Sequence, residues 1–95
     1  MEEEFNRYHI RLQGRVQGVG FRVFVHRNAK ALGLTGWVRN VGYDQVETVA
    51  EGNIDVLMKF EEILKIGPPS SQVNEISTYK ESASGEFKRF SIRYF

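Results

Sequence analysis

A glycine-rich segment at residues 14–22 joins two stretches with different hydrophobic periodicity. Its sequence is Gly14-Arg15-Val16-Gln17-Gly18-Val19-Gly20-Phe21-Arg22. Before it, Tyr8, Ile10 and Leu12 alternate with polar residues, which is typical of a half-buried strand. After it, apolar residues recur from Phe21 to Leu32 at the spacing of one helix face. The sequence therefore predicts a strand, a glycine-rich loop and the beginning of a helix.

A loop of this kind at a helix N-terminus favours binding of an anion. Its backbone N–H groups can point inward, and the helix dipole adds partial positive charge at the same place. Arg22, in the first turn of the helix, is expected to lean back over the loop. A cation there opposes the helix dipole, so a bound oxyanion would account for it. Phosphate is the expected anion, because the arginine fork matches two of its oxygens. An exposed arginine beside a glycine hinge is the alternative.

The rest of the chain alternates between strand and helix patterns. Helices are expected at about 21–32, with Gly33 after its end, and at about 54–65, between an Asn53 N-cap and a stop at Gly67-Pro68-Pro69. Strands are expected at about 7–14, 34–40, 45–52 and 73–79, the last of them irregular and bulged, and around Phe90, Ile92 and Tyr94.

This order, β-α-β-β-α-β with one more strand at the C-terminus, predicts an α+β ferredoxin-like sandwich. Both helices would cover one face of a mainly antiparallel sheet, with the additional strand at an edge. A chain of 95 residues can bury one core, so residues 1–95 are expected to form a single domain.

Composition excludes several classes of function. The net charge of +1 gives no general attraction to nucleic acid or to a membrane surface. Cysteine is absent, and His9 and His26 are expected on separate elements, so no metal site and no cofactor are predicted. The acidic N-terminus does not resemble a secretory signal, and no apolar run approaches the length of a membrane span. A cytoplasmic protein is expected.

Asn40, near the end of the second strand, is a candidate second half of the anion site. In the predicted fold, that strand can end at the sheet edge where the glycine-rich loop begins. A side-chain amide there could orient a water beside a bound phosphate without adding negative charge. The alternative is an ordinary turn residue, because Val-Gly-Tyr-Asp follows it.

The segment from Gly14 to Arg22 resembles the G-x-V-Q-G-V-x-F-R signature of the acylphosphatases. Gly36-Trp37-Val38-Arg39-Asn40 resembles the second motif of that family, and the likeness extends over nearly the whole chain. One departure concerns the turn after Asn40, where Tyr43-Asp44 replaces the family's Asp-Gly or Asn-Gly pair. Gly42 is expected to take the positive φ instead.

The resemblance implies metal-independent hydrolysis of the carboxyl–phosphate bond of acyl phosphates, giving carboxylate and inorganic phosphate. It implies that Asn40 orients the attacking water and that Arg22 binds the phosphate. The remaining phosphate ligands would be the loop amides of Arg15, Val16, Gln17, Gly18, Val19 and Gly20. The expected partner is a small acyl phosphate, or a phosphate or sulfate ion, bound by a monomer. Arg15 has a flanking position in the loop and Arg39 an alternate position in the strand, so both are expected to face solvent; the alternative is that they add positive field near the phosphate.

Two other classes of function compete with this interpretation. The stretch from Gln17 to Phe24 has some similarity to an RNA-recognition motif. Gln17, Val19 and Arg22 replace its key residues, however, and the stretch lies in a loop instead of on a sheet face. The second alternative is a non-catalytic domain that binds phosphate, since related domains occur inside larger carbamoyl-transfer proteins.

Overall fold

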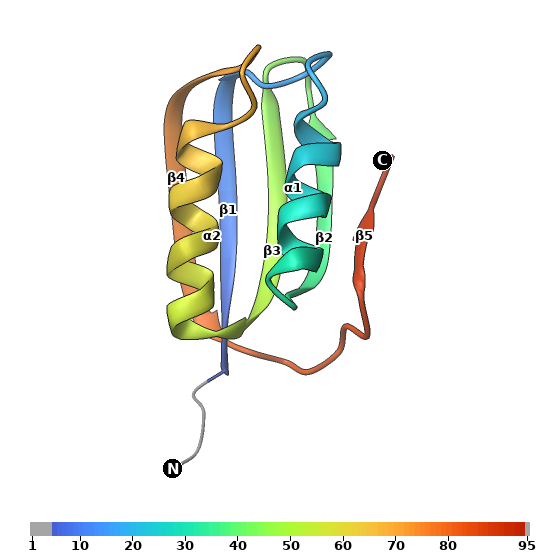
Figure 1. Ribbon diagram of the computed structural model, residues 1–95, viewed down its shortest axis with the longest axis vertical. Helices are drawn as coiled ribbons and strands as arrows, with labels where there is room; N and C mark the ends of the chain where they lie inside the picture. Colours follow the sequence, from blue (N-terminus) through green and yellow to red (C-terminus); the bar gives the residue numbers. More distant parts are fainter. Residues whose placement is uncertain (1–4, 95) are drawn as a thin grey trace.

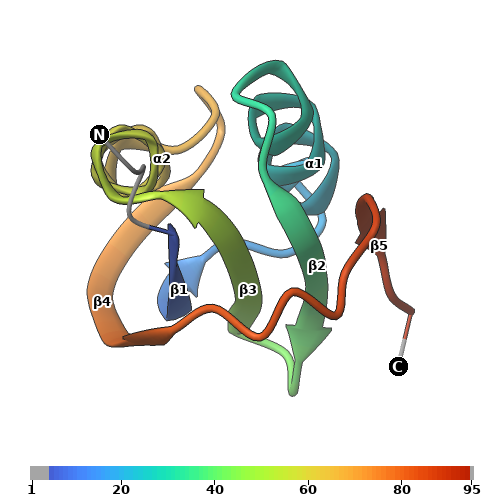
Figure 2. The same ribbon diagram turned by 90° about the horizontal axis from the view of Figure 1, so that it is seen from below.

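A five-stranded sheet carries both helices on one face, and its other face is free of helices (Figures 1 and 2). The computed structural model describes residues 5–94. The elements along the chain are β1 (Phe5–Arg15), α1 (Phe21–Ala31), β2 (Thr35–Val41), β3 (Gln45–Asn53), α2 (Ile54–Ile66), β4 (Gln72–Ser82) and β5 (Phe90–Ile92). The strand order is β4-β1-β3-β2-β5, with only β5 parallel to its neighbour. The predicted ferredoxin-like fold with an additional edge strand is confirmed.

The core lies between the sheet and the helices, where the sequence periodicity places it. Tyr8, Ile10 and Leu12 of β1 are at most 1% exposed. The side chains that pack on the sheet from the helices are also buried; they are Phe21, Val25 and Ala29 of α1 and Leu57, Phe60 and Leu64 of α2. Burial of each large apolar side chain contributes about 1.5–3 kcal/mol, so this layer fixes how α1 sits on the sheet.

The topology brings three connections together at one end of the molecule. Both β1 and β2 pair antiparallel with β3, so they run in the same direction and end at the same edge of the sheet. The loop from β1 to α1, the β2–β3 turn and the segment from α2 to β4 therefore lie at the upper end in Figure 1. The candidate phosphate loop and Asn40 belong to this end.

The outer strands differ most from the prediction. β4 extends to Ser82, well beyond the predicted end at 79, because its backbone pairs with β1 even where its own pattern is polar. Its predicted irregularity is confirmed as a bulge, since Gln13 pairs with Glu75 and Gly14 with Val73. β5 ends at Ile92, which leaves Tyr94 outside the strand.

The segment between β4 and β5 crosses beneath the sheet (Figure 2) and is held there by Glu51. The Glu51 carboxylate, 4% exposed, accepts hydrogen bonds from the backbone N–H groups of Ser84 at 2.9 Å and Gly85 at 3.0 Å. It also pairs with Arg7 at 2.7 Å. This buried carboxylate guides the chain across to the far edge, where β5 joins β2.

Candidate active site

A small pocket at the upper end of the fold contains most of the residues expected to form the site. Its volume is about 120 Å³. Eight residues line it: Val16, Gln17, Gly18, Gly20, Phe21, Arg22, Val23 and Asn40. The structure therefore brings Arg22 and Asn40, which are distant in sequence, into one pocket with the glycine-rich loop.

The loop keeps its backbone at the pocket because two of its side chains anchor it in the core. Val16 is fully buried, and the half-buried Val19 packs against the same core. Between them the chain turns through Gly18 and Gly20, with φ of 71° and 75°. These left-handed conformations strain any residue with a Cβ, which explains the glycines.

The loop that leads into α1 has unpaired backbone donors beside this pocket. Gly20 is the N-cap and has no side chain to accept a hydrogen bond, and the first turn contains no acidic residue. Among residues 5–94, no hydrogen bond uses the backbone N–H of residues 16–20 as its donor. A helix N-terminus with free amides and partial positive charge favours an anion.

Arg22 adds a full positive charge at the same place. Its side chain is half-buried, and the ion pairs of the described residues do not include it. Its guanidinium carbon lies 4.9 Å from the centre of the Tyr94 ring. The arginine therefore rests on an aromatic side chain supplied by the C-terminal end of the described chain.

Asn40 lies on the face of β2 that is turned toward the helices. Val38, two residues earlier on the same face, is fully buried in the core. The Oδ1 atom of Asn40 is buried and has no hydrogen-bond partner among the described residues. A buried acceptor without a donor costs free energy, and a water molecule would satisfy it. This is the property expected of a residue that orients water.

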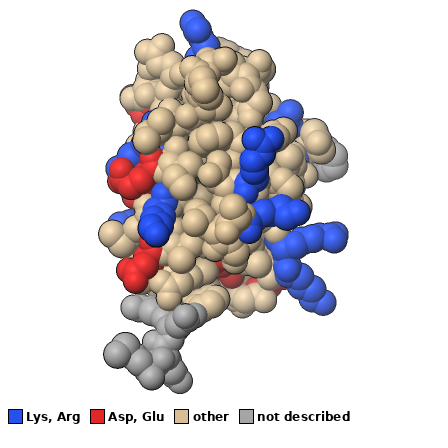
Figure 3. Space-filling view, in the orientation of Figure 1, with Lys and Arg blue, Asp and Glu red and all other residues tan. Residues whose placement is uncertain are grey.

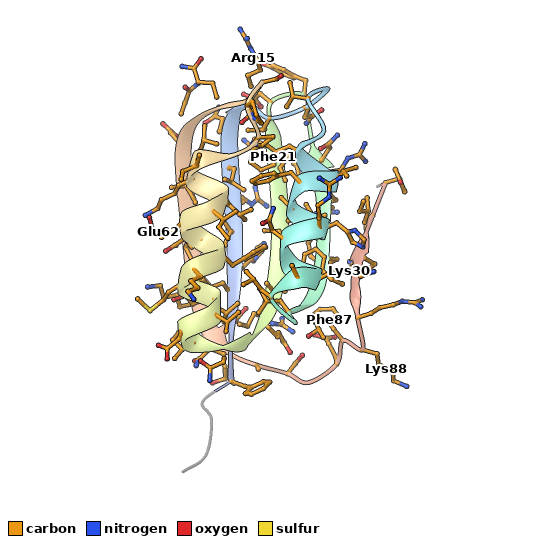
Figure 4. The ribbon with its side chains drawn as sticks, in the orientation of Figure 1. Arg15, Phe21, Lys30, Glu62, Phe87 and Lys88 are labelled. Atoms are coloured by element: carbon orange, nitrogen blue, oxygen red, sulfur yellow. The ribbon has the colours of Figure 1, made fainter. Side chains whose placement is uncertain are left out.

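Arg39 points to the opposite face of the sheet, as its alternate position requires. Its Nε donates to Glu47 at 2.7 Å, and His9 contacts the same carboxylate at 2.5 Å. Burial tends to raise the pKa of Glu47, but the hydrogen bonds from His9 and Arg39 outweigh it and hold that pKa below its usual value. Arg39 is therefore paired with Glu47, away from the pocket. Arg15 is exposed and projects from the upper end of the molecule (Figure 4).

The turn after Asn40 is tied to the phosphate loop by Gln17, a contact that no sequence pattern indicates. The Gln17 Nε2 donates to the carbonyl oxygens of Val41 at 3.3 Å, Gly42 at 3.1 Å and Gln45 at 2.9 Å. Gly42 has a φ of 60°, so it takes the positive φ expected of it in this turn.

Most of the predicted phosphate ligands line the pocket, but two do not. Arg15 and Val19 are absent from the lining, which includes Phe21 and Val23 instead. Whether the amides of Arg15 and Val19 contact a phosphate therefore stays a prediction.

The described residues contain no group of three His, Cys, Asp or Glu side chains suited to a metal ion. In the same part of the chain, no helix is both long and apolar enough to cross a membrane.

Known proteins share this arrangement of elements. The family model described as Acylphosphatase matches residues 8–92. A curated Acylphosphatase from Syntrophotalea carbinolica is 44% identical over 88 residues, which is 93% of this chain and 96% of the relative. The crystal structure of acylphosphatase from Bacillus subtilis has a TM-score of 0.90 at 44% identity, covering 94% and 99% of the two chains. A structure of full-length HypF in its phosphate- and nucleotide-bound form matches 98% of this chain with 12% of its own, at 31% identity and a TM-score of 0.84.

Proposed function

Since this chain belongs to the acylphosphatase family, we propose that its upper pocket is where the enzyme hydrolyses acyl phosphates. The protein is an acylphosphatase, and its reaction releases a carboxylate and inorganic phosphate. The proposal concerns the roles of individual residues. The loop amides and Arg22 hold the phosphate, and Asn40 orients the attacking water.

Binding of the phosphate is the first step of the proposed mechanism. Val16, Gln17, Gly18 and Gly20, whose backbone amides are free, line the pocket together with Arg22 and the N-terminus of α1. Together they would neutralise the charge that spreads over the phosphate oxygens in the transition state. This juxtaposition of unpaired amides and a guanidinium carries the proposal.

Attack by water is the second step. Asn40 Oδ1 accepts a hydrogen bond from the water and holds its oxygen near the phosphorus, so that the reactants are already oriented. The water oxygen bonds to phosphorus as the bond from phosphorus to the acyl oxygen breaks, and the carboxylate leaves. A phosphate oxygen of the substrate takes the proton, because the described residues that line the pocket include no carboxylate or imidazole. The same lining supports a reaction that needs no metal ion.

Hydrolysis of benzoyl phosphate in excess chelator tests these roles. The wild type should turn over, whereas Arg22→Ala should lower kcat/KM by about 100-fold and weaken inhibition by inorganic phosphate. Asn40→Ala should lower kcat by a similar factor and leave phosphate binding intact. Arg27→Ala, an exposed arginine of the same helix outside the pocket, is the matched control, and in buffer above about 0.1 M salt, where its charge is screened, it should keep the wild-type kcat and kcat/KM. Chelator-sensitive activity or an active Asn40→Ala would contradict the mechanism.

The structure gives no support to RNA binding through the motif-like stretch. Its aromatic residues would have to lie on an exposed sheet face to stack on bases. Phe21 is instead 1% exposed and points from α1 toward α2 (Figure 4), and Phe24 is half-buried in the same helix. A phosphate-binding role without turnover is distinguished by the benzoyl phosphate assay, in which such a domain would bind phosphate and leave the substrate intact.

A monomer is the proposed active form, because both halves of the pocket come from one chain. Light scattering during size-exclusion chromatography, with activity measured across the peak, tests this. Activity confined to a species of twice the mass of 11.0 kDa would contradict it.

A further inference from the structure

The amide of Gln17 forms a bridge between the two halves of the pocket. It faces three carbonyl oxygens of the β2–β3 turn, those of Val41, Gly42 and Gln45. Only a donor can face three acceptors, so the NH₂ group must point to the turn, and its two hydrogens are shared among the three oxygens. Val41 and Gln45 pair with each other at the base of the turn. Gln17 therefore binds both sides of the hairpin at once.

Two neighbouring contacts connect the same segments at a different point. The backbone N–H of Gly14 donates to the Asp44 carbonyl at 3.0 Å, and the Gln13 side chain donates to the Asp44 carboxylate at 2.9 Å. Both contacts lie at the end of β1. Gln17, in contrast, lies in the part of the loop that lines the pocket, and its side chain reaches the turn from there.

Asn40 has little other support for its position. On one side, its strand pairs with β3 through Val46. On the other side, the described pairing of β2 with β5 ends at Val38. Among residues 5–94, the buried Oδ1 of Asn40 has no hydrogen-bond partner that could hold the side chain. The orientation of this amide is therefore set by the backbone immediately before Val41, which is where Gln17 is bound.

We propose that Gln17 is a positioning residue, whose side chain fixes the distance between the phosphate loop and Asn40. The inference rests on the proposed role of Asn40 in orienting water. Because Gln17 acts through the turn, its loss should lower the rate of the chemical step more than it weakens phosphate binding. A displacement of about 1 Å between reacting groups can cost up to about 100-fold in rate.

The test compares Gln17→Met, which keeps the length of the side chain and removes the donor, with wild type, Asn40→Ala and the double variant. Gln17→Met should lower kcat for benzoyl phosphate by about 10- to 100-fold, with inhibition by inorganic phosphate unchanged. It should have no further effect in the Asn40→Ala background, because the group it positions is gone. The side-chain amide resonances of Asn40, followed by NMR, should shift or broaden in Gln17→Met.

Gln13→Leu is the matched control, since it removes one side-chain hydrogen bond to the same turn outside the pocket. It should keep kcat and leave the Asn40 resonances in place. Full activity of Gln17→Met, or a loss of activity that adds to that of Asn40→Ala, would overturn the inference. An active Asn40→Ala would instead overturn the proposed function. The NMR measurement reports on Asn40 in either case, so the two failures can be told apart.

Discussion

The guanidinium of Arg22 lies over the ring of Tyr94, with 4.9 Å between the guanidinium carbon and the ring centre. Arg22 lies in the first turn of α1, and Tyr94 follows the last strand, β5. The contact therefore joins segments that are far apart in sequence. Tyr94 is 73% exposed, so this cation–π contact lies at the solvent-exposed surface. It restricts the arginine before any substrate arrives.

Replacement of Tyr94 by leucine should weaken phosphate binding. A cation–π contact at an exposed position contributes about 0.5–1 kcal/mol, and its loss leaves Arg22 more conformational freedom to lose on binding. We expect the inhibition constant of inorganic phosphate to rise about two- to fivefold, and Tyr94→Phe to behave as wild type. Tighter phosphate binding in Tyr94→Leu would mean that the ring competes with the ligand for Arg22.

Gly20→Ala should affect both stability and phosphate binding, whereas Gly33→Ala should affect stability alone. The two glycines have φ of 75° and 73°, and an added Cβ meets no atom within 4 Å at either position. The left-handed conformation should therefore cost each alanine variant about 1–2 kcal/mol of unfolding free energy. Only Gly20 lines the pocket, so only its variant should lose phosphate affinity, as measured by calorimetry. An equal loss of affinity in Gly33→Ala would contradict the assignment of the loop.

Glu51 should make the protein sensitive to acid. Burial tends to raise the pKa of Glu51, but hydrogen bonds from Ser84, Gly85 and Arg7 outweigh it, so the pKa lies below its usual value of 4.5. The Glu51 carboxyl therefore binds a proton less tightly in the folded protein than in the unfolded chain. The resulting stability is present above about pH 4.5 and is lost as the pH falls below that value.

Glu51→Gln should lower the free energy of unfolding by about 1–3 kcal/mol at pH 7. The difference from wild type should shrink as the pH falls below about 4.5, which urea unfolding at several pH values would measure. Glu81→Gln is the control. Its carboxylate lies 3.9 Å from Arg7 but is 41% exposed, so its loss should cost at most about 1 kcal/mol. A pH-independent difference for Glu51→Gln would contradict the prediction.

One edge of the molecule is basic (Figure 3), and Arg22 of this edge lines the pocket. Lys and Arg side chains gather over α1 and the chain around β5, and neither 21–31 nor 87–94 contains an acidic residue. The basic edge consists of Arg22, Arg27, Lys30, Lys88, Arg89 and Arg93. Its field should attract anionic substrates toward the pocket.

Charge removal on the basic edge should slow capture of the substrate without changing the chemical step. The double variant Arg27→Gln/Lys30→Gln should lower kcat/KM at low salt and leave kcat unchanged. The difference should fade above about 0.1 M salt, where the screening length falls to about 10 Å. Lys59→Gln/Lys65→Gln on α2 removes the same charge elsewhere and serves as the control. Equal effects of the two double variants would exclude a local field.

Periodicity was sufficient to predict the central elements. Tyr8, Ile10 and Leu12 face the core as their alternation indicates, and Asn53 caps α2 through a hydrogen bond to the Asp55 N–H at 2.9 Å. The edge strands were harder, because backbone pairing with β1 extends β4 to Ser82, where the sequence has no apolar pattern. The end of β5 was misjudged for a related reason. Tyr94 continues the alternation, but pairing with β2 stops at Ile92.

Sequence also indicated which residues share the pocket, and it gave no sign of how they are held. Arg22 and Asn40 could be placed together because, in the predicted fold, the second strand can end at the sheet edge where the first strand ends, and the observed pairing places both ends there. The contacts of Gln17 with the turn and of Tyr94 with Arg22 join segments that no local pattern relates. Such contacts depend on the final distances between elements, which only the assembled fold defines.

The attachment of β5 has a consequence for local unfolding. Only three residues of β5 pair with β2, whereas β1 pairs along its length with both neighbours. The edge strand should therefore open while the rest of the sheet stays intact, and its amides should exchange with solvent long before those of β1. Each opening would carry Tyr94 away from Arg22. On heating, phosphate affinity should then decline before the global unfolding transition, so that substrate capture and fold stability have separate temperature limits.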